Sequence, residues 1–505
     1  MSHIPKQIAK RLVTKLNNRR MHNRFQVGAV LALVTGLLLS TLSLSNLFKS
    51  YQTRLSDFFY RPAPPSGQVI LVQIDDASLT EIGPWPWSRG TLANLLGTLA
   101  RARPGAVAFD ILLLDSTFDD AALAQVFQSL PNLSQPVAGV NTSRILPSLL
   151  TFPLFDSALT PAPALLTANT RLGHDMVVAD NDQVVRRVPI AIQAAGRRYV
   201  ALGIVALSSS RPALVPPPEG SATANLITQL LEDGHGDMYV NFTKWDNRYV
   251  ISAADLLRGR VNPERVQDKT IFIGLTGSAA TESYETPVTF EGQRAYPIEI
   301  QADLAETLVT GRLLFEQDGL TQITMIFLMA ILAGATLPHF RFLSAAGLTI
   351  LYFLAYLVYA FDKFNSGIIV PPLYHALALL IMFVLSMTYR YYAEDRQRGR
   401  VEQLFRRTAS SQVVEQVLSV FERDKLRLSG VRREITLLHV DLHCFSALTD
   451  VLSPEDLMAT LDLYTLRIVE VVFHHAGLVV MQTGESIVAA WNLPLIQSDP
   501  ARRAV

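Results

Sequence analysis

Four long apolar runs constrain this chain more than any other feature. The first extends from Val27 to Phe48 without a charge, and a longer apolar block extends from Leu320 to Tyr389. Two short polar breaks divide that block into runs at 320–337, 342–361 and 368–388. Each run is long enough to cross a bilayer as a helix, and 49% hydrophobic residues in 505 is a high share for a soluble protein. We therefore expect a multidomain membrane protein with four helical transmembrane spans.

The charges beside these runs predict the orientation of the chain. An N-terminal arm, residues 1–26, carries lysines and arginines but no acid, and a second basic cluster at 390–400 follows the last run. Because basic flanks stay in the cytoplasm, we expect both termini inside the cell (inner or plasma) membrane and residues 51–317 outside. A cleaved signal peptide is the alternative for the first run. The lack of an A-x-A-like site before Lys49 favours an uncleaved anchor.

The region at 51–317 alternates short apolar strand patterns with helical patterns, which is typical of an α/β domain. One strand pattern at 69–74 ends at Asp75 and Asp76, and another at 106–109 ends at Asp110. Strand ends are the usual place for a ligand site in an open α/β sheet. Capping of the turn or helix that follows also explains such acids, and we favour that interpretation.

This region resembles a known sensor domain. The stretch at 72–113, with its turn Trp85-Pro86-Trp87-Ser88-Arg89, resembles the opening of the CHASE2 extracytoplasmic sensor domain. Further pieces of the same pattern lie at 180–189, 239–242, 270–278, 286–287 and 298–302. The resemblance implies an α/β extracytoplasmic sensor whose ligand is unknown.

Two strand patterns near the C-terminus end in acids. The run Ile435–Val440 ends at Asp441, and the run Leu478–Met481 leads to a turn that holds Glu485 before a second strand returns. The second pattern predicts a β-hairpin with an acid at its tip. Two neighbouring carboxylates suit a divalent cation. A helix expected from Ala447 would point backbone N–H groups at a metal-bound polyphosphate.

The same stretch resembles the nucleotide cyclase domain of class III adenylate and guanylate cyclases. Besides Asp441, the matching residues are Phe445-Ser446, Ser453-Pro454-Glu455, His475-Ala476-Gly477, Gly484-Glu485, Asn492-Leu493-Pro494 and Asp499 to Val505. The resemblance implies an α+β (ferredoxin-like) cyclase homology domain that works as a homodimer on ATP or GTP, with no nucleic-acid partner. It also implies site residues, namely Asp441, Leu442 and Glu485 for Mg²⁺ or Mn²⁺, and Phe445, Ser446 and Met481 for the nucleotide.

Three departures from the cyclase pattern bear on activity. Glu485 stands where the family has an Asp, and Met481 stands where adenylate cyclases usually have a purine-reading Lys. The sequence ends at Val505, before the region in which the family has its purine-contacting acid and its transition-state Asn and Arg. We therefore expect little cyclic-nucleotide synthesis from this chain alone. A non-catalytic cyclase half that dimerises or binds a nucleotide is the second hypothesis; a transporter is disfavoured because no span holds an ionisable cluster.

A charged segment with a helical pattern precedes the cyclase-like stretch. Its position predicts either a dimerising signalling helix or a plain amphipathic linker. The spacing of its apolar residues is compatible with both. The expected parts are the arm 1–26, a span at 27–48, the sensor 51–317, three spans within 320–389, this segment at 390–430 and the partial cyclase domain 431–505.

Overall fold

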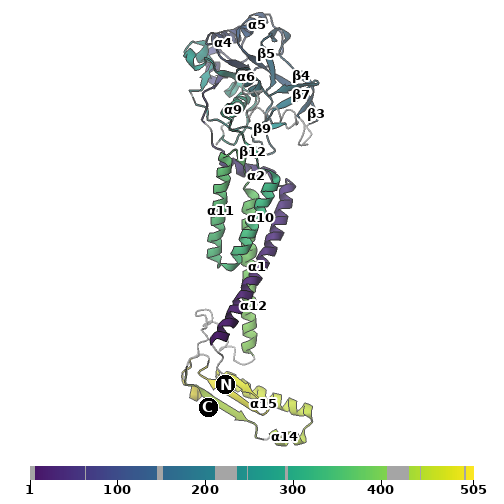
Figure 1. Cartoon of the computed structure of the whole chain (residues 1–505), viewed down its shortest axis with the longest axis vertical. Helices are drawn as coiled ribbons and strands as arrows, with labels where there is room; N and C mark the ends of the chain where they lie inside the picture. Colours follow the sequence, from purple (N-terminus) through teal and green to yellow (C-terminus); the bar gives the residue numbers. More distant parts are fainter. Residues whose placement is uncertain are drawn as a thin grey trace. The chain divides into compact units, whose positions relative to one another are not determined.

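The computed structural model describes residues 6–62, 64–144, 152–210, 236–246, 248–289, 294–406, 432–443, 445–493 and 496–505. The chain divides into two compact units, Met1–Val384 and Leu385–Val505. The first unit holds an α/β domain and long helices, and the second holds a small fold of strands and helices (Figure 1).

A nine-stranded mixed sheet forms the centre of the α/β domain. Its strands follow the order β10-β1-β11-β2-β3-β4-β7-β8, and β5 also pairs with β3. Strands β10, β1, β11, β2 and β3 run parallel, so the residues that follow them meet at one edge of the sheet. The strands are β1 (Val69–Ile74), β2 (Ala106–Phe109), β3 (Leu133–Arg144), β4 (Leu154–Leu159), β5 (Thr170–His174), β7 (Ala191–Ala194), β8 (Arg197–Val200), β10 (Val250–Ser252) and β11 (Thr270–Leu275).

Helices cover both faces of this sheet. Alternation along β1 places Ile70 and Val72 in a core with α4 and α5, and Val69 and Leu71 in a core with α6 and α9. The arrangement is the α/β fold that the alternating patterns predicted. The helices are α2 (Lys49–Ser56), α3 (Asp76–Ile82), α4 (Arg89–Arg101), α5 (Asp120–Ser129), α6 (Leu202–Ser210), α8 (Ala253–Leu257) and α9 (Pro297–Thr310).

Among the residues that the structure describes, four helices are long and apolar enough to cross a membrane. They are α1 (Lys6–Leu44), α10 (Gly319–Thr336), α11 (Phe342–Asn365) and α12 (Leu373–Arg406). Two ends differ from the apolar runs. Helix α1 ends at Leu44, because Asn46 adopts a left-handed φ of 55°, which breaks a helix. Helix α12 begins after Pro371 and Pro372, whose rings disfavour helix in the residue before them.

Helices α1 and α10 approach each other closely at two glycines. A Cβ placed on Gly28 would lie 2.0 Å from the carbonyl oxygen of Gly334. Only residues without a side chain allow backbones this close, which is a common way for membrane helices to associate. The contact therefore fixes the first apolar helix against the second.

Packed side chains join the α/β domain to the apolar helices. The rings of Tyr60 and Phe364 meet edge to face with centroids 5.0 Å apart, and Tyr356 is buried in the same core. Strand β12 (Phe315–Glu316), which leads into α10, pairs in parallel with β13 (Ile368–Ile369), between α11 and α12. The junction is thus a small core and a two-stranded sheet.

The second unit is a three-stranded antiparallel sheet with helices. The strands β14 (Thr436–Asp441), β15 (Leu478–Gln482) and β16 (Ser486–Trp491) have the order β14-β16-β15. The helices are α14 (Phe445–Val451), α15 (Pro454–His474) and α16 (Pro500–Ala504). Val472 of α15 packs on Ile487 and Trp491 of β16. The unit is α+β, and a ferredoxin-like topology stays a prediction, as does the role of 390–430, of which 407–430 lies outside the described residues.

Candidate functional site

The two predicted acids of the second unit lie side by side. Asp441 is the last residue of β14 and pairs with Ser486, the first residue of β16. The backbone N–H of Leu442 donates to the carbonyl oxygen of Glu485 at 2.9 Å. Strand pairing therefore fixes Asp441 beside the tip of the β15–β16 hairpin that carries Glu485.

The donor set at this tip fits a hard divalent cation. The side chains of Asp441 and Glu485 are both exposed, and carboxylate oxygens are the ligands that Mg²⁺ and Mn²⁺ prefer. The carbonyl oxygen of Leu442 accepts a hydrogen bond from Phe445 at 3.1 Å, and its second lone pair remains for a metal. Within the described ranges no cluster of three or more His, Cys, Asp and Glu residues could hold a metal. Water or phosphate oxygens would complete the coordination.

The predicted nucleotide-contacting residues surround the same tip. Helix α14 begins at Phe445, two residues before the expected Ala447, so Phe445 and Ser446 form its first turn. Met481 pairs with Val488, which also pairs with His439 of β14. Since Asp441 lies two residues after His439, Met481 and Asp441 share one face of the sheet. Met481 is 53% exposed there and offers only a thioether to a base.

In the α/β domain, Asp75 and Asp76 both accept hydrogen bonds from the chain itself. Asp75 precedes α3 and accepts from the Ser78 N–H at 2.8 Å. Asp76 accepts from the Ser278 N–H at 2.8 Å, in the glycine-containing loop after β11. That loop therefore binds a carboxylate of the chain itself. Capping explains Asp75, and a contact with a distant loop explains Asp76.

Asp110 behaves differently from these two acids. Its Oδ1 atom is buried and has no hydrogen-bond partner within the described part of the chain. Burial and then the nearby charge of Asp175 raise its pKa well above the ordinary value. Burial likewise raises the pKa of Asp175, to about 6, and Glu282 adds to the shift. The carboxyl edge of the sheet thus holds a pair of acids that resist ionisation.

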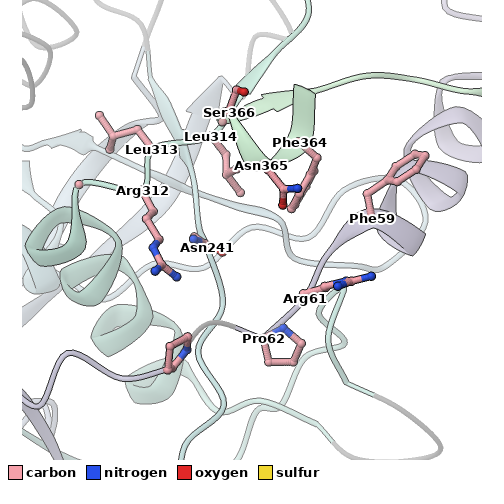
Figure 2. A pocket seen from close by; sticks show the side chains of 13 residues that line it. Phe59, Arg61, Pro62, Asn241, Arg312, Leu313, Leu314, Phe364, Asn365 and Ser366 are labelled. Atoms are coloured by element: carbon pink, nitrogen blue, oxygen red, sulfur yellow. The ribbon is translucent and has the colours of Figure 1, made fainter. Parts of the chain in front are cut away.

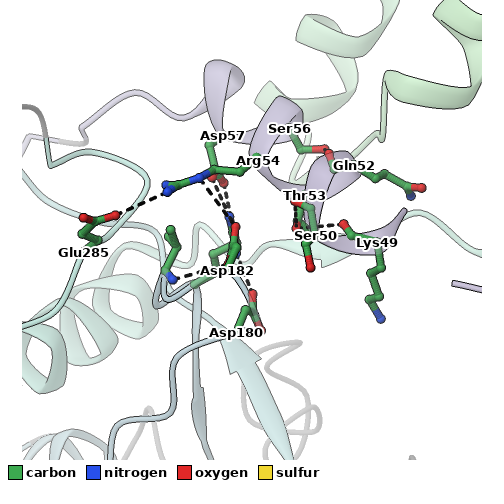
Figure 3. Close-up of polar contacts among 12 residues, drawn as sticks. Lys49, Ser50, Gln52, Thr53, Arg54, Ser56, Asp57, Asp180, Asp182 and Glu285 are labelled. Carbon is green, nitrogen blue, oxygen red and sulfur yellow. Dashed lines mark hydrogen bonds and ion pairs between the residues drawn. The ribbon is translucent and has the colours of Figure 1, made fainter. Parts of the chain in front are cut away.

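A buried arginine cluster lies between the domain and the first apolar helix. The side chain of Arg186 is 2% exposed and pairs with Asp57 at 2.7 Å, Asp180 at 2.8 Å and Asp182 at 2.6 Å. Figure 3 shows these carboxylates converging, with Arg54 of α2 bridging Asp182 and Glu285. Asp57 follows α2 directly. The cluster therefore ties the segment after α1 to the sheet domain.

Hydrogen bonds within this cluster stabilise the charged forms of Arg186 and Asp182 against burial. Burial opposes the charge of Arg186, yet the hydrogen bonds that its guanidinium donates to Asp182 and Asp57 raise its pKa above the ordinary arginine value. Burial also opposes ionisation of Asp182, but Arg186 holds the Asp182 pKa below its usual range. The sequence alone predicts no role for Arg186. The available signal was an acid pair followed four residues later by an arginine pair.

Two comparisons bear on this chain. The family model for the CHASE2 domain matches residues 29–336, more than half of the chain. A stretch of 73 residues is 33% identical to "Adenylate cyclase 1" of Rhizobium meliloti (strain 1021). That alignment covers 14% of this chain and 11% of the relative, so the chain matches only a small part of that protein.

Proposed function

The chain belongs to the CHASE2 family, and from that premise we propose that it is a membrane receptor whose extracytoplasmic sensor controls a class III cyclase-type unit. The sensor region and the distant adenylate cyclase similarity together suggest a signalling receptor. The apolar helices fit a membrane protein. In this proposal the unknown ligand binds outside, and the C-terminal unit works inside as a homodimer.

One observation carries the cyclase part of the proposal. Asp441 of β14 lies beside Glu485 at the tip of the β15–β16 hairpin, through strand pairing and the hydrogen bond from the Leu442 N–H to the Glu485 carbonyl oxygen. These two carboxylates and the Leu442 carbonyl would hold Mg²⁺ or Mn²⁺. A divalent cation, when bound, would favour deprotonation of the nucleotide 3′-hydroxyl and neutralise phosphate charge. The chain's own residues would position ATP or GTP, with Phe445 and Ser446 near the metal side.

A second candidate is a non-catalytic unit that binds a metal-nucleotide complex or only dimerises. It is favoured by Met481, whose exposed side chain has no donor with which to read a purine edge. Glu485 also places its oxygens one methylene further from the backbone than an aspartate would. This second candidate keeps the receptor role and removes only turnover.

The deciding experiment measures metal binding and turnover separately. The full chain in detergent is titrated with Mn²⁺, then assayed with Mg²⁺ or Mn²⁺ and ATP or GTP, beside Asp441→Ala and a version extended through any downstream reading frame. Loss of Mn²⁺ binding in Asp441→Ala would support the metal site. Cyclic-nucleotide formation that depends on Asp441 would support the cyclase, and metal binding without turnover in either length would support the second candidate. Unchanged Mn²⁺ binding in Asp441→Ala would contradict the metal site, and with it the cyclase and the metal-nucleotide form of the second candidate.

A further inference from the structure

A cavity of about 600 Å³ lies at the junction between the sensor and the apolar helices. Its walls come from the segment after α2, the turn after α9 and the end of α11 (Figure 2). A Cβ on Gly367 would lie 2.5 Å from the Leu313 carbonyl oxygen, so these walls meet tightly. The side chains that matter below are Phe59, Arg61, Asn241, Arg312, Phe364 and Asn365.

The charge of this cavity is positive. Arg61 and Arg312 line it, and among its described lining residues there is no carboxylate. Neither guanidinium forms an ion pair within the part of the chain that the structure describes. In Figure 2, Arg312 extends past Asn241, whereas Arg61 extends away from Arg312, on the side where Phe59 lies. The Arg312 guanidinium and the Asn241 amide therefore offer neighbouring hydrogen-bond donors to an anion, and the charge of Arg61 adds to the positive potential at the cavity.

An apolar stripe leads along α11 to the cavity. Leu354, Val358, Phe361 and Asn365 are spaced by four, three and four residues, so they share one helix face. Leu354 and Val358 are 52% and 70% exposed, and the guanidinium carbon of Arg61 lies 4.5 Å from the centroid of the Phe361 ring. The stripe thus changes from exposed aliphatic to aromatic to polar at the cavity, as an amphipathic ligand would require.

We propose that this cavity binds a phosphate-bearing anion, supplied by the headgroup of an anionic phospholipid at the outer surface of the membrane. Arg312 and Asn241 would hold the phosphate, Arg61 would attract it by its charge, and the acyl chains would follow the apolar stripe of α11. A soluble phosphate compound offers the same headgroup chemistry without the chains. The site lies apart from the cyclase-type acids, so its binding does not depend on what the C-terminal unit does.

The test uses the full chain in a non-ionic detergent and isothermal titration calorimetry. The probes are dihexanoyl phosphatidylglycerol, dihexanoylglycerol, which lacks the phosphate, and inorganic phosphate. The variants are Arg61→Gln with Arg312→Gln, the charge-keeping Arg61→Lys with Arg312→Lys, and Arg197→Gln on the exposed start of β8 as the matched control. Because a charge-assisted hydrogen bond contributes strongly, each lost arginine is expected to weaken binding by about tenfold.

Binding of the short-chain phosphatidylglycerol that is weakened in the double glutamine variant, and kept in the lysine and Arg197→Gln variants, supports the lipid source. Equal binding of inorganic phosphate with the same pattern supports the site with a soluble source. Binding of dihexanoylglycerol as tight as that of phosphatidylglycerol, binding unchanged in the double glutamine variant, or no binding of either phosphate probe overturns the proposal. If the double variant does not fold, the single Arg312→Gln variant is judged by the same criteria.

Discussion

At the scale of single residues, the chain contains a buried cation whose environment is almost entirely ionic. Arg186 satisfies its guanidinium on Asp57, Asp180 and Asp182. Such a cluster contributes little net stability when intact but leaves uncompensated buried charge when one partner is removed. The arginine is thus a positioning residue for the junction.

We expect Arg186→Met to destabilise the protein by about 3–5 kcal/mol, because it removes the buried cation that three carboxylates share and leaves them only the more exposed Arg54 and Arg187. The measurement is the urea midpoint of the full chain in detergent. Arg197→Met, at an exposed position on β8, is the control and is expected to stay within about 0.5 kcal/mol. Equal midpoints for the two variants would contradict the role given to the cluster.

The acids at the sheet edge predict a pH effect of definite sign. The pKa of Asp175 rises from 3.8 unfolded to about 6 folded, so the folded state holds its proton longer. This acid therefore lowers stability as the pH rises from about 4 to about 6, and the loss is complete above that window. Asp175→Asn, which is neutral throughout, should be more stable than the parent by about 3 kcal/mol at pH 7.5 and nearly equal to it near pH 4.

The check for Asp175→Asn is the difference between variant and parent midpoints across this pH range, since other acids shift both curves alike. Asp182→Asn is the opposite control, because the pKa of Asp182 is lowered in the fold. That variant should lose stability at neutral pH. A difference for Asp175→Asn that does not vary with pH would refute the assignment.

Residue placement could be predicted only where each partner ends a strand pattern that the sequence shows. Asp441 and Glu485 were expected to meet because each strand pattern ended in an acid and a hairpin links the second pattern. Asp57 and Arg186 are 129 residues apart, and no local pattern indicates such a pair. The raised pKa of Asp110 likewise depends in part on Asp175. That residue follows β5, whose carboxyl end lies at the same edge of the sheet.

At the scale of elements, the hairpin of the second unit depends on a glycine that precedes it. A Cβ on Gly477 would lie 2.7 Å from the Trp491 ring and 2.8 Å from Val472. The indole of Trp491 is fixed there, because its Nε1–H donates to the His475 carbonyl at 2.9 Å. The close approach explains the glycine in the sequence His475-Ala476-Gly477.

Gly477→Ala is expected to destabilise the second unit by about 1–3 kcal/mol through overpacking. Gly484→Ala is a matched control in the hairpin turn, where an added Cβ meets nothing within 4 Å. Pulse proteolysis in urea, read with a C-terminal tag, follows this unit alone. If both alanine variants resist proteolysis like the parent, the tight contact at Trp491 does not limit stability.

Elements were predicted better than their partners. The strand patterns at 69–74 and 106–109 are present as β1 and β2. Their separation by β11, which arrives about 160 residues later, could not be predicted, because pairing between distant parallel strands has no local signal. The span ends were displaced for a local reason, namely Asn46 and the Pro371-Pro372 pair.

At the scale of the whole molecule, the apolar helices and the basic flanks predict an even number of crossings. Both termini are then inside, and the sensor is outside. Cysteine labelling can test this topology, but it needs exposed positions. Ser134 in the sensor is fully buried in β3, so a cysteine there would not react with a label. Gln125 on α5 and Asp462 on α15 are exposed and serve instead.

In a background in which the one cysteine, Cys444, is replaced by Ser, we expect an impermeant maleimide to label Gln125→Cys on intact cells. Asp462→Cys should be labelled only after the membrane is permeabilised. Denatured protein gives the full labelling of both positions as a reference. Reaction of both cysteines on intact cells would show that the predicted topology is wrong.

Helix α12 has a mechanical consequence. It runs without a break over 34 residues, about 50 Å, from Leu373 to Arg406, although the candidate span within it ends at Ala393. A continuous rod passes on twist and axial displacement, whereas a loop would absorb them. One residue inserted after Ala393 would rotate the remaining part of helix α12 by about 100° about the helix axis. Seven inserted residues would nearly restore its original orientation. A signal that passes along this helix can therefore take the form of a rotation about the helix axis or a displacement along it.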